Sequence, residues 1–287
     1  MLSDEQRKER MLGLGSSEVA AVCGLNPWRS AHDVWLVKRG LADEADEENV
    51  RTRMGLRVEA AIADEYQLET GAELAHWGTV TGSEPWMLAT PDRAVYGARR
   101  LVEIKNVGWR SAFHWGSDED AIPDYYRPQV EWQMLVCDAD ETDVAAWLGG
   151  SEFRIYRIKR NRALGDAIAN VCRRFWLDNV IGGEPPKVDG SDGARRMLAK
   201  LYPANTKPLI VATSEANDLA ERLATTKHDA AILDEKKSHL ENRMRELIAD
   251  ADGILGPDWK ATLKADKNGR RSLRFTTQQE KEKGKAA

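Results

Sequence analysis

The order of hydrophobic periods along the 287-residue chain is the feature that most limits its fold. Apolar residues first recur at helical spacing, from about residue 15 to residue 70, and then gather in short runs bounded by turn residues. The strands expected from these runs are 73–80, 86–89, 93–96 and 100–106. A helix to about residue 136, a hairpin over 142–149 and 152–159, and a helix over 161–182 follow. This order predicts an α/β or α+β core with a central mixed sheet flanked by helices.

A change in composition at residues 182–193 (GGEPPKVDGSDG) predicts a linker after this core. Beyond it, apolar residues alternate spacings of four and three from Leu219 to Leu247, which is typical of a heptad helix. The sequence DKNG then indicates a hairpin that carries several Lys and Arg residues. We divide the chain into a core over 1–182, a linker and short helix over 183–212, a helical heptad segment with a basic hairpin over 213–276, and a disordered tail over 277–287.

Composition excludes several classes of protein. No apolar run approaches the roughly 20 residues that span a bilayer, so we expect no membrane protein. The polar N-terminus MLSDEQRKER does not resemble a secretory signal. Cys23, Cys137 and Cys172 are isolated and odd in number, which argues against a disulfide scaffold, a zinc ribbon or an iron–sulfur cluster. We therefore expect a cytoplasmic protein.

Residues 90–105 (TPDRAVYGARRLVEIK) carry the chemistry. Glu103 and Lys105 lie two positions apart on one expected strand, so their side chains share a face of the sheet, and Asp92 joins them if its strand is a neighbour. Two carboxylates and an ammonium suit a phosphodiesterase that uses a divalent metal, because hard oxygen ligands bind Mg²⁺ and the metal activates a water. The Ile104 carbonyl and Glu59, on the preceding helix, are further candidate ligands.

Four motifs resemble those of a known family, the phage-type alkaline exonucleases that include lambda exonuclease and the YqaJ-like viral recombinases, within the PD-(D/E)XK nuclease superfamily. The resemblance covers about residues 8–180 and implies a restriction-endonuclease-like core. The similar segments, in chain order, are GLGSSEVAAVCGLNPWRSAHDVW, MGLRVEAAI, the pair ATPDRAV and LVEIK, and YYRPQVEWQM.

The resemblance assigns roles around the metal. It implies that Asp92, Glu103, Glu59 and the Ile104 carbonyl bind two Mg²⁺ ions, for which Mn²⁺ substitutes, and that Lys105 positions and activates the attacking water. Such hydrolysis proceeds without a covalent intermediate.

The resemblance also implies a pocket for a 5′-phosphate, built from Arg10, Ser17 and Thr90. Arginine offers a forked donor to a phosphate, and the hydroxyls add further donors. Thr90 stands where a serine is common in the family, and it keeps the hydroxyl. Arg7 is the alternative to Arg10.

The helix after the metal motif is the last part of the expected site. Tyr126, Gln129 and Gln133 fall on one side of this helix, at spacings of three and four. In the family this face lines the active site. The resemblance therefore implies a catalytic role for Gln129 and DNA binding for Tyr126 and Gln133. Trp28 and Trp109, beside loops, are the candidates for stacking on nucleobases.

The function that the resemblance implies is a Mg²⁺-dependent, processive 5′→3′ exonuclease that acts on double-stranded DNA ends and leaves 3′ single strands for phage recombination. A ring-shaped homotrimer and a single-strand annealing protein are the expected assembly and partner. The alternatives are a RecB-type or restriction-type endonuclease on the same core, and a non-catalytic DNA-binding recombination scaffold.

The formal net charge of −5 leaves room for a DNA partner if its distribution is uneven. Acid gathers in residues 42–48, 117–120 and 138–143, and base gathers in 154–162, around Arg93, Arg99 and Arg100, and in the C-terminal hairpin. We expect the acidic segments on an outer surface and the basic segments on a separate face toward DNA.

Overall fold

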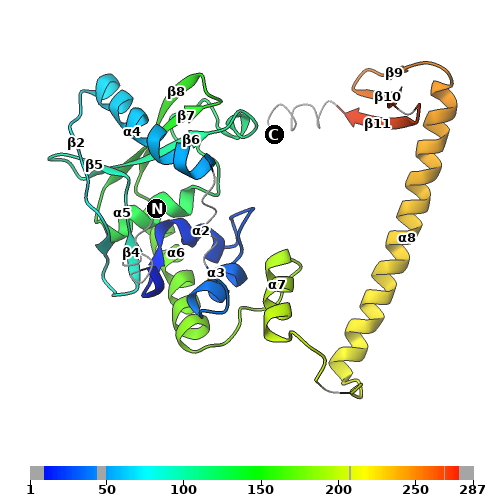
Figure 1. The fold of residues 1–287 in the computed structure, drawn as a ribbon, viewed down its shortest axis with the longest axis horizontal. Coiled ribbons are helices and arrows are strands. Elements are labelled where there is room, and N and C mark those ends of the chain that lie inside the picture. The colour runs from blue at the N-terminus through cyan, green and yellow to red at the C-terminus, as the bar shows by residue number, and fades with distance from the viewer. Residues whose placement is uncertain (1–9, 44–49, 207, 268, 278–287) are drawn as a thin grey trace. The chain divides into compact units, whose positions relative to one another are not determined.

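The computed structural model describes residues 10–43, 50–206, 208–267 and 269–277 (Figure 1). The chain forms two compact units, Met1–Pro203 and Ala204–Ala287. The candidate site lies wholly in the first unit. The domain boundaries at 182 and 212 expected from composition stay a prediction. The two compact units divide after residue 203.

A five-stranded mixed sheet forms the centre of the first unit, in the order β2-β5-β6-β7-β8. The neighbours β6 and β7 are parallel, and the other pairs are antiparallel. The mixed α/β architecture expected from the hydrophobic pattern is thereby confirmed. The strands are β2 (Leu74–Ala75), β5 (Arg93–Val95), β6 (Arg100–Val107), β7 (Glu141–Leu148) and β8 (Glu152–Lys159).

Two helices cover opposite faces of this sheet because β6 and β7 alternate their buried side chains. The helix α4 (Val50–Thr70) packs Ile62 and Tyr66 against Ile104 on one face (Figure 1). The helix α5 (Arg127–Val136) packs Val130 and Met134 against the other face. Since Glu103 and Lys105 alternate with Ile104, their side chains point toward α5, into the space that the site occupies.

A second, three-stranded sheet has the order β1-β4-β3 and adjoins the helices of the N-terminal part. Its strands are β1 (Leu14–Gly15), β3 (Val80–Thr81) and β4 (Met87–Ala89). The single strand expected over 73–80 is therefore wrong, since Leu74–Ala75 and Val80–Thr81 join different sheets. The two short runs are separated by a turn at Gly78, whose φ of 69° is a conformation that glycine adopts readily.

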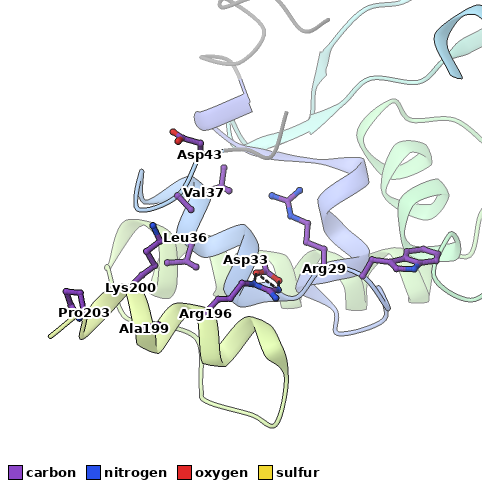
Figure 2. Close-up of a pocket in the computed structure, with 11 residues that line it drawn as sticks. Arg29, Asp33, Leu36, Val37, Asp43, Arg196, Ala199, Lys200 and Pro203 are labelled. Atoms are coloured by element: carbon purple, nitrogen blue, oxygen red, sulfur yellow. Dashed lines mark hydrogen bonds and ion pairs between the residues drawn. The ribbon is translucent and has the colours of Figure 1, made fainter. Parts of the chain in front are cut away.

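The remaining helices of the first unit pack around a core that contains Trp35, Trp132 and Trp176. The helix α7 joins α3 through the ion pair of Arg196 Nη2 with Asp33 Oδ1, at 2.8 Å (Figure 2). Gly193 permits this approach, because a β-carbon there would overlap Ser30 Oγ. These helices are α2 (Ser16–Val22), α3 (Ala31–Lys38), α6 (Arg162–Arg174), which continues as a π-helical segment (Phe175–Ile181), and α7 (Asp192–Leu201), with a short 3₁₀ turn at Ala112–His114.

The second unit consists of a long helix and a small sheet. The helix α8 (Ser214–Ile248) carries the predicted heptad stripe, and its Leu219, Leu233 and Leu240 are exposed in the single chain. The strands β9 (Gly253–Leu255), β10 (Trp259–Ala265) and β11 (Arg271–Thr277) form an antiparallel sheet that includes the predicted hairpin. Among the described residues, no helix is both long and apolar enough to cross a membrane.

The expected separation of acidic and basic surfaces is wrong where the structure describes both. Arg99 pairs with Asp138 and Asp140, at 3.0 and 2.8 Å. Arg157 pairs with Asp143, whose side chain is fully buried, at 3.0 Å. The parallel pairing of β6 with β7 and the antiparallel pairing of β7 with β8 bring the basic and acidic segments side by side, so their charges compensate each other. The acidic residues 44–48 lie outside the described residues.

Candidate active site

Asp92, Glu103 and Lys105 come together from two neighbouring strands. The pairing of Arg93 with Val102, in the antiparallel pair β5 and β6, brings Asp92 beside Glu103. The backbone N–H of Ile104 donates to Asp92 Oδ2 at 2.7 Å, which fixes the Asp92 carboxylate against β6. The neighbouring strands that the sequence argument required are therefore present, and the two carboxylates and the ammonium form one cluster.

Two glutamines of α5 hold Glu103 from the opposite side. Gln129 Nε2 donates to Glu103 Oε1 at 2.6 Å, and Gln133 Nε2 donates to Oε2 at 2.7 Å. Lys105 Nζ also donates to Oε1, at 2.5 Å. Because Glu103 is only 3% exposed and Gln133 is fully buried, this orientation of the carboxylate is fixed by packing as well as by hydrogen bonds.

Burial and mutual repulsion change the protonation of the cluster. Burial, together with the charges of Glu103 and Glu59, raises the pKa of Asp92 to about 8, against the lowering effects of Lys105 and the Ile104 N–H. Burial alone would lower the pKa of Lys105, but the charges of Glu103 and Asp92 outweigh it and raise that pKa. Without a metal, the surroundings therefore favour the protonated form of Asp92 and the charged form of Lys105.

Glu59 lies near this cluster but is bound elsewhere. Its Oε1 accepts from Arg93 Nη1 at 2.9 Å, an ion pair between α4 and β5. Within the part of the chain that the structure describes, no group of three or more His, Cys, Asp or Glu residues gathers in a way that could hold a metal. A third carboxylate ligand from Glu59 therefore stays a prediction, with Glu59 held by Arg93 in this structure.

The remaining donors fit a divalent cation. Two neighbouring carboxylates repel each other, which favours a proton on one of them, and a cation placed between them would replace that proton. Asp92, Glu103 and the carbonyl of Ile104 supply the hard oxygen ligands that Mg²⁺ prefers. This set fits one ion, and a second would need oxygen ligands from water or from a substrate phosphate.

Tyr126 connects this cluster to the surface. It is the residue just before α5, and Lys105 Nζ lies 4.8 Å from the centre of its ring, a cation–π contact. The ring also packs on Trp115 at 5.4 Å and on Tyr125 at 4.6 Å. Tyr126, Gln129 and Gln133 all face Lys105 or Glu103, as the helical spacing of three and four predicted.

The expected phosphate-binding hydroxyls lie at one end of the small sheet. The strands β1 and β4 are parallel, with Gly15 opposite Leu88, so Ser17 and Thr90 each lie two residues beyond this pair, at the same end of the sheet. Both side chains belong to exposed residues. Thr90 Oγ1 is 3.1 Å from Thr79 Oγ1, and Arg10 accepts a hydrogen bond from Lys38 through its backbone carbonyl. Arg7 lies outside the described residues.

Arg93 is the functional neighbour that sequence reasoning did not place. The prediction counted it only as part of a basic region, although it directly follows Asp92. Its ion pair with Glu59 depends on how α4 packs over the sheet, which the spacing of residues on either element does not contain. The only sequence signal for this ion pair was the position of an arginine directly after Asp92 of the metal motif.

Comparison with known proteins shows which family the chain resembles. Residues 5–140 match the model of the YqaJ-like viral recombinase domain, and this range includes every residue of the cluster described above. The chain is therefore similar to that family over about half of its length. It is also 27% identical over 262 residues to the uncharacterized protein YqaJ of Bacillus subtilis (strain 168), covering 89% of this chain and 82% of that protein.

Solved structures share the fold of the YqaJ-like domain. An alkaline exonuclease, LHK-Exo from Laribacter hongkongensis, superposes with a TM-score of 0.50 at 20% identity, over 70% of this chain and 100% of that one. The same enzyme in complex with dAMP gives a TM-score of 0.51 at 19% identity, over 68% and 95%. The predicted nuclease-like core is thereby confirmed.

Proposed function

We propose that this protein is a metal-dependent deoxyribonuclease that degrades double-stranded DNA from a 5′ end and leaves a 3′ single strand. The observation that carries the proposal is the cluster of Asp92, Glu103 and Lys105, in which Glu103 is buried, Asp92 is half-buried and Glu103 is held by three donors. Carboxylates withdrawn from water beside a lysine suit phosphodiester hydrolysis better than a purely structural role, since burying such charges is costly.

Each residue has a part in this reaction. Asp92, Glu103 and the Ile104 carbonyl would hold Mg²⁺, which lowers the pKa of a bound water and neutralises charge on the phosphate. Gln129 and Gln133 keep Glu103 in one orientation. Lys105, as a cation, donates toward the attacking water or the scissile phosphate and so positions the nucleophile. Ser17, Thr90 and Arg10 would bind the terminal phosphate at the end of β4, two residues before Asp92.

The finer parts of the proposal follow the family resemblance. They are a second Mg²⁺ ion, replacement by Mn²⁺, a processive reaction on a ring-shaped homotrimer, a single-strand annealing protein as partner, and a role in phage recombination in the cytoplasm. Glu59 would join the metal site only after release from Arg93. The proposal does not include the acidic outer surface and the separate basic face expected from the sequence, because the described acidic and basic side chains pair with one another.

End-dependent cleavage is the test that separates this function from its alternatives. We expect linear duplex with one 5′-phosphorylated end to be converted to single strands in Mg²⁺, and no conversion in EDTA, because the carboxylates need a cation to bind the phosphate. Covalently closed plasmid should stay intact. Digestion of end-labelled duplex and of plasmid, followed by electrophoresis, measures both.

The other outcomes are informative. Cleavage of the closed plasmid would favour the endonuclease, and DNA binding without any cleavage in Mg²⁺ or Mn²⁺ would favour the scaffold. Equal digestion in EDTA would overturn the metal-dependent mechanism. The particle mass in solution, measured by light scattering, tests the trimer separately.

A further inference from the structure

An open cleft lined with aromatic side chains lies directly beside Lys105, and the reaction proposed above does not use it. The cleft has a volume of about 550 Å³, within the range of pockets that hold small ligands. It is bounded by the end of β6, the loop at residues 108–111 and the chain before α5. Its aromatic residues are Trp28, Trp109, Tyr125 and Tyr126.

The two tryptophans are exposed although burial of aromatic surface is favourable. Trp28 is 68% exposed and Trp109 is 72% exposed. Trp28 contacts Tyr125 edge to face, at 5.0 Å between ring centres, and Tyr125 contacts Tyr126 at 4.6 Å. Contiguous rings therefore lead from the surface at Trp28 to the ring that touches Lys105.

Positive charge accompanies the rings. The Arg110 guanidinium lies 5.0 Å from the centre of the Trp109 ring, and Lys105 lies 4.8 Å from that of Tyr126. Trp28 also lines the groove between α3 and α7 (Figure 2). This groove contains three basic residues, Arg29, Arg196 and Lys200, and two acidic residues, Asp33 and Asp43. Aromatic faces next to cations are the combination that binds single-stranded nucleic acid, through base stacking and phosphate contacts.

We propose that this aromatic cleft binds unpaired nucleobases of the strand being cut, next to the scissile phosphate. The inference rests on the proposed function for its substrate, DNA, and adds to it that Trp28 and Trp109 are the rings on which the bases of that strand stack. The sequence marked these two tryptophans separately, and the structure brings them to one cleft at the site.

The test uses the full-length chain and four variants. Trp109→Ala and Trp28→Ala remove a stacking face, Trp109→Phe retains one, and Trp77→Ala is the matched control, an exposed tryptophan that does not line the cleft. Binding of a fluorescent oligothymidylate in EDTA is measured by anisotropy. We expect the two cleft alanine variants to bind about tenfold more weakly or worse, and the phenylalanine and control variants to bind nearly as the wild type.

A second measurement distinguishes stacking from a structural role. In Mg²⁺, duplexes that carry ordinary or abasic nucleotides at the 5′ end are compared. Removing the bases should slow the wild type about tenfold, whereas Trp109→Ala should be slow on both duplexes and lose little more, because its stacking partner is already absent.

The two proposals fail in different ways. If the wild type cleaves DNA and the cleft variants match it in binding and rate, the cleft inference is wrong and a protein segment becomes the better occupant. If the wild type does not cleave in either metal, the proposed function is wrong. The tryptophan dependence of oligothymidylate binding then still supports or overturns the cleft as a single-strand site.

Discussion

Replacing Lys105 by Met is expected to lower the rate of duplex digestion by about 10²- to 10⁴-fold, the usual contribution of a group that positions or transfers a proton. Lys105 is the only described lysine that touches Glu103, and its ammonium is held 2.5 Å from that carboxylate. Methionine keeps the length and packing of the side chain but cannot donate to water or phosphate. The rate is measured on end-labelled linear duplex at saturating Mg²⁺.

The control for this variant is Lys159→Met, which removes an exposed lysine at the end of β8. Its rate should stay within about twofold of the wild type, because exposed side chains far from the reacting atoms contribute little. Thermal unfolding of both variants verifies that the fold is retained. A Lys105→Met variant that folds and digests DNA at the wild-type rate would remove Lys105 from the mechanism.

Replacing Asp92 by Asn is expected to stabilise the metal-free protein at alkaline pH while it abolishes digestion. The pKa of Asp92 is raised to about 8 in the folded chain by burial and by Glu103, from 3.8. For a carboxyl whose pKa is raised by folding, the unfolded state loses its proton first, so folding stability falls as pH rises from about 4 to 8. The loss accumulates through that window and levels off above pH 8.

Asparagine removes this titration, and its side-chain oxygen can still accept from the Ile104 N–H. The stability difference between Asp92→Asn and the wild type should therefore grow between pH 5 and pH 8 and then stay constant. Urea unfolding in EDTA at several pH values measures the difference, with the exposed Asp118→Asn as the control. A difference that does not change with pH would show that Asp92 is charged in the folded protein throughout.

Adding Mg²⁺ should offset the loss of wild-type folding stability that is expected as pH rises. Because a cation replaces the proton on Asp92, Mg²⁺ should stabilise the wild type more strongly at pH 8 than at pH 6, and should stabilise Asp92→Asn little at either pH. The same unfolding curves, repeated with Mg²⁺ in place of EDTA, test this without reference to catalysis.

Local spacing explains which parts of the site the sequence predicted. The two-residue period of a strand places Glu103 and Lys105 on one face whatever the rest of the chain does, and the helical period does the same for Gln129 and Gln133. Both pairs are found as expected. The strand expected over 73–80 was wrong because a short apolar run does not reveal which of two sheets each of its ends will join.

The distribution of charge over the surface was predicted wrongly, because it too depends on which strands pair. The basic residues around Arg99 and the acidic residues around Asp140 lie about forty positions apart in sequence, and only the parallel pairing of β6 with β7 brings them into contact. Composition counts these charges but does not pair them. Their expected separation onto different faces therefore failed where packing joined them.

By itself, the sequence determined the mixed α/β core and the residue types and faces of a metal-binding nuclease site, since these depend on short-range periods and on motif chemistry. Only the tertiary structure decided that Gln129 and Gln133 hold Glu103, that Arg93 holds Glu59, and that Trp28 and Trp109 line one cleft with Tyr126. Each of these contacts joins residues from different elements, and the packing of helices on a twisted sheet sets such distances.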